Sequence, residues 1–187
     1  MRLPLKQILF VPKSQGFLFL VFGILLIAPE ILFFFGGELY MPALSVMPPV
    51  MIGCCFQFAY TFYVNIEHYL KKTLLLSIAT GVAATLNLAL NYLFIPSFGY
   101  IAAAFTTLVG YTALLLLHYL FVRKTEYKNL YDNMFIGKVM LIFLAVSTLF
   151  GFLYQHDFLR CCFIVVYIVV FAIIVAMHRK VFTRIKF

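Results

Sequence analysis

Glu30 is the first residue in this sequence from which chemistry is expected, because it lies inside an apolar run over residues 16–35. A carboxylate at membrane depth is energetically unfavourable, so such residues are rare. Where they occur, they commonly accept a proton or a cation. The alternative is an interfacial side chain that follows Pro29 and reaches the lipid headgroups. Glu30 is therefore a candidate for ion coupling.

Polar side chains also recur at helical spacing in two other apolar runs. After Gly53, three of them follow at i, i+4 intervals, and in the next run two amides continue a face begun by Ser77, Thr80 and Ala84. Two facing stripes of this kind can border a hydrated path, and the alternative is that they only form hydrogen bonds between helices. The residues expected nearest such a path are Gln57, Thr61, Asn65, Asn87 and Asn91.

A third pattern consists of small residues. Ala102, Thr106 and Gly110 recur every four residues. Small residues at this spacing let two helix backbones approach closely within a membrane. We expect these three to form a helix-packing face.

Motifs of the common enzyme classes and metal sites are absent from the sequence. It has no HExxH, GxSxG, Walker A or GxGxxG motif, and its four histidines are scattered. The neighbouring pairs Cys54-Cys55 and Cys161-Cys162 are interpreted as small hydrophobic residues. We therefore expect no catalytic residue, no metal and no cofactor. Lys138, His118, His178 and Arg160 are assigned to snorkelling near helix ends, whereas Glu38, Glu67 and Asp157 are assigned to loops without a special role.

The composition of the chain indicates that most of its residues lie in a lipid bilayer. Of the 187 residues, 65% are hydrophobic and 11% are charged, against about 25% charged in soluble domains. The chain is thus predicted to be an all-α integral membrane protein. Six apolar runs are each about long enough to cross the hydrocarbon core, and they fill the chain as one domain over residues 1–187. The predicted helices are 16–35, 43–66, 73–95, 100–122, 134–154 and 160–177.

The positive charges predict the orientation of these helices. If the amino terminus is cytoplasmic, every Lys and Arg except Arg160 falls in a cytoplasmic segment or at its edge. This asymmetry follows the positive-inside rule and predicts both termini on the cytoplasmic side. The net charge of +8 is then explained by topology and anionic headgroups, and no nucleic-acid partner is expected.

The stretch Asn91–Leu108, NYLFIPSFGYIAAAFTTL, joins two of the predicted helices. It resembles the Asn-x-x-x-Ile-Pro-x-x-Gly-x-x-Gly-Ala-Ala run of the Wzx-type polysaccharide (O-antigen) flippases, with Ala102 where that family often has Gly. These flippases belong to the multidrug/oligosaccharidyl-lipid/polysaccharide exporter superfamily. Residues 35–43, FGGELYMPA, are similar to a helix end of the family, and Lys71-Lys72-Thr73 is similar to its entry into the following helix.

The resemblance implies a function and partners. It implies that an undecaprenyl-linked oligosaccharide is moved across the bacterial cytoplasmic (inner) membrane, without covalent chemistry. Members of the family have two bundles of helices, and this chain is similar to the carboxy-terminal bundle. The expected partner is a separate amino-terminal half or a second copy, unless the chain is an inactive remnant. The alternatives are a non-transporting scaffold or assembly subunit and, with less support, a multidrug exporter fragment.

Overall fold

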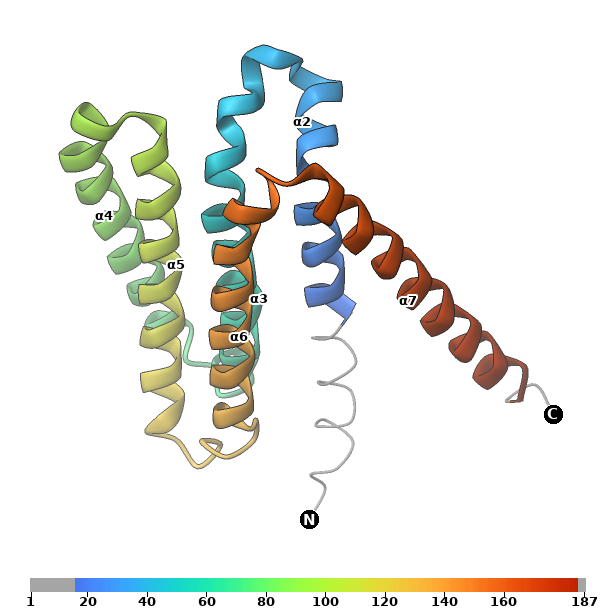
Figure 1. Ribbon diagram of the computed structural model, residues 1–187. Helices are drawn as coiled ribbons and strands as arrows, with labels where there is room; N and C mark the ends of the chain where they lie inside the picture. Colours follow the sequence, from blue (N-terminus) through green and yellow to red (C-terminus); the bar gives the residue numbers. More distant parts are fainter. Residues whose placement is uncertain (1–15, 185–187) are drawn as a thin grey trace.

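The computed structural model describes residues 16–184, and the side chains there except those of residues 135 and 175–184. Within this range the chain forms helices joined by short connections, with no strand (Figure 1). Five helices are long and apolar enough to cross a membrane, or six if one bent pair is counted as a single span. The predicted all-α membrane bundle is confirmed, and the protein is a multi-pass membrane protein.

The first span is bent where the sequence predicts one helix over 16–35. A helical segment, Gly16–Leu26, and α2, Ala28–Gly36, meet at an angle of 59°. The cause is Pro29 in the first turn of α2, because proline cannot donate a backbone hydrogen bond to the carbonyl four residues earlier. That carbonyl, on Leu25, instead accepts a hydrogen bond of 3.0 Å from the Tyr154 hydroxyl.

The next span, predicted as one helix over residues 43–66, begins with a 3-10 helix and starts earlier than predicted. A 3-10 helix, η1 (Glu38–Val46), leads directly into α3 (Met47–Tyr69). Pro48 and Pro49 lie in the first turn of α3, where a missing N–H breaks no helical hydrogen bond. At its other end α3 continues beyond Ile66 to Tyr69, so Glu67 belongs to the helix.

Helices α4 (Thr73–Phe98) and α5 (Tyr100–Arg123) form a hairpin. The sequence predicts a turn over residues 96–99, but α4 continues through Pro96 and only Gly99 leaves the helix. Gly99 has φ = 63°, a left-handed value that glycine adopts without a steric penalty, and its N–H donates to the carbonyl of Ile95. A single glycine therefore reverses the chain. Helix α5 packs along both α3 and α4.

The last two helices are α6 (Asn133–Leu153) and α7 (Asp157–Arg184). Helix α6 packs on α3, whereas α7 leans away from the bundle (Figure 1). The Tyr167 hydroxyl attaches α7 to the first segment through a hydrogen bond of 3.1 Å to the carbonyl of Phe19. Most side chains of α7 up to Ile174 are exposed and apolar.

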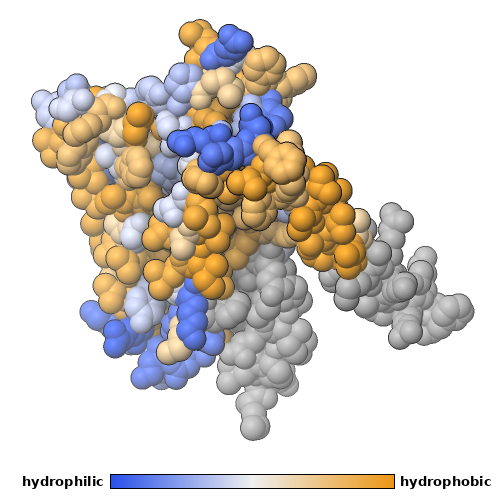
Figure 2. Space-filling view, viewed as in Figure 1, coloured by the Kyte–Doolittle hydropathy of each residue, from blue (hydrophilic) through white to orange (hydrophobic). Residues whose placement is uncertain are grey.

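The buried core is small because much of the apolar surface faces outward. Its main cluster joins the first segment, α3 and α6 around Leu25, Leu26, Cys55 and Phe150. On the face seen in Figure 2, hydrophilic residues gather toward the two ends and hydrophobic residues lie between them. An apolar belt between polar ends is the surface expected of a protein whose solvent is lipid.

Candidate functional sites at the two ends of the bundle

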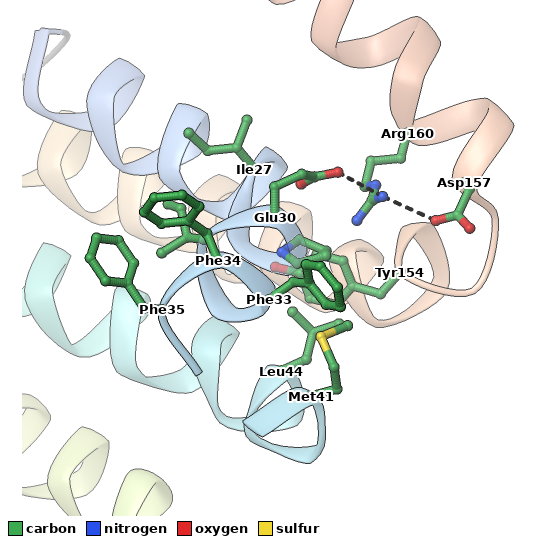
Figure 3. A pocket seen from close by; sticks show the side chains of 12 residues that line it. Ile27, Glu30, Phe33, Phe34, Phe35, Met41, Leu44, Tyr154, Asp157 and Arg160 are labelled. Atoms are coloured by element: carbon green, nitrogen blue, oxygen red, sulfur yellow. Dashed lines mark ion pairs between the residues drawn. The ribbon is translucent and has the colours of Figure 1, made fainter. Parts of the chain in front are cut away.

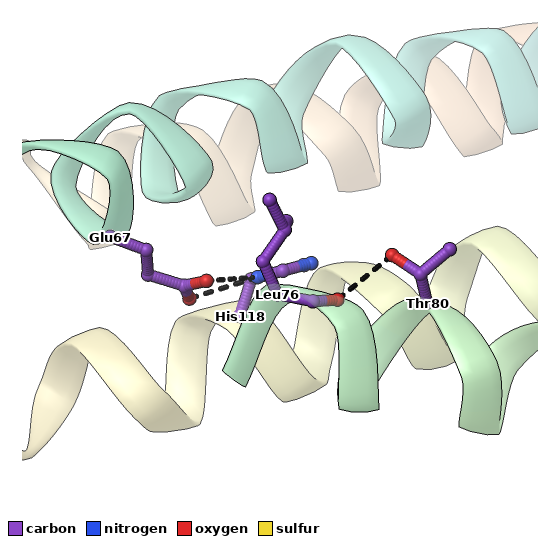
Figure 4. Close-up of polar contacts among 4 residues, drawn as sticks. All are labelled: Glu67, Leu76, Thr80 and His118. Carbon is purple, nitrogen blue, oxygen red and sulfur yellow. Dashed lines mark hydrogen bonds and ion pairs between the residues drawn. The ribbon is translucent and has the colours of Figure 1, made fainter. Parts of the chain in front are cut away.

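A carboxylate and an imidazole meet inside the bundle near the end where α3 and α5 finish. The Nδ1 atom of His118 lies 2.8 and 2.9 Å from the two carboxylate oxygens of Glu67 (Figure 4). The exposed fractions of the His118 and Glu67 side chains are 0% and 3%. Ionisable groups this deep in a low-dielectric interior are rare unless they are paired. The Nδ1 atom and the carboxylate therefore form one buried, hydrogen-bonded pair.

The surroundings of this pair leave one imidazole atom unused. The ring of Tyr60 stacks on that of His118, with 5.4 Å between ring centroids. On α4, the Thr80 hydroxyl is nearby in Figure 4 but donates to the carbonyl of Leu76, 2.9 Å away. The Nε2 atom of His118 is buried and has no hydrogen-bond partner within the described part of the chain. A proton gained at Nε2 would raise the net charge of the pair by one unit.

Sequence reasoning missed this pair for two reasons. It placed Glu67 in a loop because the apolar run ends at Ile66, whereas α3 continues through Glu67. It assigned His118 to snorkelling, whereas the side chain is fully buried. Both assignments are wrong. One available signal was that Tyr60 and Glu67 are seven residues apart, two helical turns, and therefore share a face of α3.

At the opposite end of the bundle, Arg160 lies between two carboxylates. Its Nη2 atom is 2.9 Å from Oε1 of Glu30 and 3.1 Å from Oδ1 of Asp157. The Arg160 side chain is 9% exposed, but those of Glu30 and Asp157 are 53% and 83% exposed. Arg160 is therefore folded inward and does not snorkel, and Asp157 has a partner. The ion-coupling role of Glu30 stays a prediction.

These three residues border a pocket of about 770 Å³ between α2, η1 and the α6–α7 turn (Figure 3). The rest of the lining is mainly apolar, with Phe33 and Met41 among the side chains labelled in Figure 3. The Nε atom of Arg160 is buried without a hydrogen-bond partner in the described residues. The pocket therefore combines apolar walls with an excess of negative charge.

The predicted small-residue face lies between α4 and α5. Ala102, Thr106 and Gly110 are all buried there. Thr106 donates a hydrogen bond to the side-chain oxygen of Asn91, and Asn91 donates to that of Asn87 over 2.6 Å. A Cβ atom added at Gly110 would lie 3.3 Å from Nδ2 of Asn87, so the absent side chain makes room for the amide. The two amides are therefore used in helix packing.

The remaining candidates on α3 do not join this network. Gln57 and Asn65 are exposed, and Thr61 donates to the carbonyl of Phe58 on its own helix. No hydrogen bond between described residues connects these three to Asn87 or Asn91. The cause is geometric, because a spacing of four residues rotates by about 40° per step in an α-helix. Gly53 therefore faces α5, where Leu108 and Tyr111 contact it, while Asn65 has turned outward.

Within residues 16–184, no group of three or more His, Cys, Asp or Glu side chains could hold a metal ion. Among known proteins, no family model, no curated protein and no solved structure matches this chain.

Proposed function

We propose that this chain is a membrane transport protein that moves lipid-linked oligosaccharide repeat units across the bacterial cytoplasmic membrane. The choice of substrate is supported by the likeness of Asn91–Leu108 to the Wzx-type flippases. Such translocation makes and breaks no covalent bond. The protein has to offer a polar path to the sugars while the polyprenyl chain stays in lipid.

The observation that carries the transport proposal is the burial of Glu67 and His118. Removing ionisable groups from water is unfavourable by several kcal/mol for each ion, and in membrane proteins such groups commonly belong to proton or ion pathways. Proton exchange at Nε2 of His118 would change the net charge of the pair within the bundle. We propose that this exchange couples α3–α5 packing to transport. Glu30 is a weaker candidate because its side chain is 53% exposed, whereas that of Glu67 is 3% exposed.

The exposed polar side chains of α3 support a second bundle as the partner. Gln57 and Asn65 lie in a helix that is long and apolar enough to cross the membrane, yet they are exposed. Amides facing hydrocarbon need partners. A second bundle, either a separate amino-terminal half or another copy of this chain, would supply them and would enclose the path between the two bundles.

The experiment is to delete the gene and to measure lipid-linked glycan on each side of the membrane. Loss of transport should accumulate the intermediate on the cytoplasmic side and reduce surface polysaccharide. Complementation with the wild-type chain should reverse both effects. If the deletion leaves both quantities unchanged, the flippase proposal is rejected.

One observation favours the second candidate, a non-transporting scaffold or assembly subunit. Asn87, Asn91 and Thr106 satisfy one another between α4 and α5, which is sufficient for packing alone. The substitution Glu67→Gln separates the two candidates because it keeps the shape of the side chain and removes its charge. A scaffold should retain its function in the Glu67→Gln variant, and a proton-coupled transporter should lose it while remaining in the membrane at the same level.

A further inference from the structure

The pocket beside Glu30, Arg160 and Asp157 has a charge that restricts its ligand. The twelve residues that line it include two carboxylates and one guanidinium, so its net charge is −1. Because both carboxylates are more than half exposed, each has room for another partner besides Arg160. An anionic ligand would meet net repulsion, whereas an ammonium group would find two acceptors.

The Arg160 guanidinium imposes a second requirement. Arg160 lines the pocket, and its side chain is 9% exposed. A phosphate oxygen suits a guanidinium group especially well. The ligand therefore needs a cation and an acceptor close together.

The apolar lining supplies the third requirement. Phe33, Phe34 and Phe35 are 58%, 83% and 83% exposed, and Met41 and Leu44 continue the apolar wall (Figure 3). Exposed aromatic faces can stabilise an ammonium group, and the remaining surface suits hydrocarbon chains. The elements that form the pocket, α2, η1 and the α6–α7 turn, lie at one end of the bundle (Figure 1). A lipid in the membrane can reach the pocket with its headgroup level with the charges.

We propose that this pocket binds a phospholipid whose headgroup carries a primary ammonium, as phosphatidylethanolamine does. The ammonium donates hydrogen bonds to the carboxylates of Glu30 and Asp157, and a phosphate oxygen accepts from the guanidinium group of Arg160. The acyl chains lie along the phenylalanine side chains and Met41. Phosphatidylcholine has no N–H donor, and phosphatidylglycerol has no cation, so both fit less well.

Binding of this lipid goes beyond the transport proposal and does not depend on it. The lipid would attach the α6–α7 turn to α2, two parts of the chain that the Glu30–Arg160 ion pair already connects. A failure of lipid selectivity would leave the deletion experiment unaffected. Conversely, an unchanged glycan level in the deletion strain would leave lipid binding intact.

The test uses the full chain, purified in detergent and titrated with phosphatidylethanolamine, phosphatidylcholine or phosphatidylglycerol of the same acyl chains. Native mass spectrometry counts the retained lipids, and the melting temperature reports stabilisation. Phosphatidylethanolamine should bind most tightly and raise the melting temperature most. Glu30→Gln should weaken its binding about tenfold, as expected for one charge-assisted hydrogen bond. The same variant should bind phosphatidylglycerol more tightly, because Arg160 is then less neutralised.

Two further variants serve as a control and as a second test of the pocket carboxylates. Glu38→Gln removes another exposed carboxylate from the neighbouring η1, outside the pocket lining, and should leave lipid selectivity unchanged. Asp157→Asn provides a second test because its exposed side chain can be replaced without disturbing the fold. Equal binding of the three lipids by the wild-type chain overturns the proposal. So does a preference for phosphatidylethanolamine that persists in both Glu30→Gln and Asp157→Asn.

Discussion

The two ion pairs lie at opposite ends of one bundle and differ chiefly in their access to water. Glu67 and His118 are both almost completely buried, and each depends on the other. At the other end only Arg160 is buried, while its two carboxylate partners remain largely exposed. Ionisable side chains at the two ends therefore lie in different environments. A pair closed to solvent can change its charge state only by exchanging a proton, whereas an open one can accept a ligand.

Electrostatics gives this difference a magnitude. Two unit charges about 4 Å apart interact by about 4 kcal/mol near a protein surface and by about 1 kcal/mol in water. Exposed pairs consequently contribute about 0–1 kcal/mol to stability, while breaking a buried pair destabilises strongly because one polar group is left without its partner. Substitutions at the buried end should therefore lower the free energy of unfolding more than substitutions at the exposed end.

The largest effect is expected from His118→Ala. This change leaves the Glu67 carboxylate buried without a partner and removes the ring that stacks on Tyr60. The free energy of unfolding should fall by about 3 kcal/mol. Thermal or denaturant unfolding in a mild detergent measures it. His68→Ala is the matched control, because His68 is exposed on the same turn of α3 as Glu67 and should change stability by less than about 0.5 kcal/mol. If His118→Ala and His68→Ala lowered the free energy of unfolding equally, the buried pair would contribute no special stability.

An intermediate effect is expected from Tyr154→Phe. The hydroxyl is the donor that satisfies the carbonyl of Leu25, which Pro29 leaves unpaired at the bend. Its loss should destabilise the chain by about 1 kcal/mol. The same unfolding measurement applies, with Tyr92→Phe on the exposed face of α4 as the control. If Tyr154→Phe has no effect, the bend does not depend on this hydrogen bond.

The smallest effect is expected from Asp157→Asn in the absence of lipid. Its side chain is 83% exposed, so its ion pair with Arg160 is screened by solvent. Stability should change by less than about 0.5 kcal/mol. A loss as large as that of His118→Ala would show that the exposed end contributes as much to folding as the buried one.

The regular features of the fold could be predicted from the sequence because they depend on neighbours along one helix. Apolar runs and the charge asymmetry predict the membrane helices, and the spacing of Ala102, Thr106 and Gly110 predicts a packing face. The sequence leaves open whether Asn87 and Asn91 border a path with the α3 stripe or form hydrogen bonds between helices, and the structure places them against this packing face. The α3 stripe does not face these amides, because residues spaced by four rotate progressively around an α-helix over several turns.

Neither ion pair could be predicted in this way. Glu67 and His118 are 51 residues apart in sequence and meet only because α5 packs along α3. Glu30 reaches Arg160 only because Pro29 bends the first span and brings α2 beside the α6–α7 turn. Each pair results from tertiary packing between distant helices. The sequence shows which ionisable residues lie in apolar runs, but it does not show which residues of other helices they contact.

The central claim is that Glu67 and His118 couple a proton to transport, and a protonophore tests it most directly. The deletion strain is complemented with the wild-type chain or with Glu67→Gln, and translocated glycan is measured before and after the pH gradient is collapsed. Translocation by the wild-type chain should fall severalfold on collapse. The Glu67→Gln chain, present at the same level, should translocate little under either condition. A Glu67→Gln chain that translocates like the wild type and responds equally to the protonophore would contradict the claim.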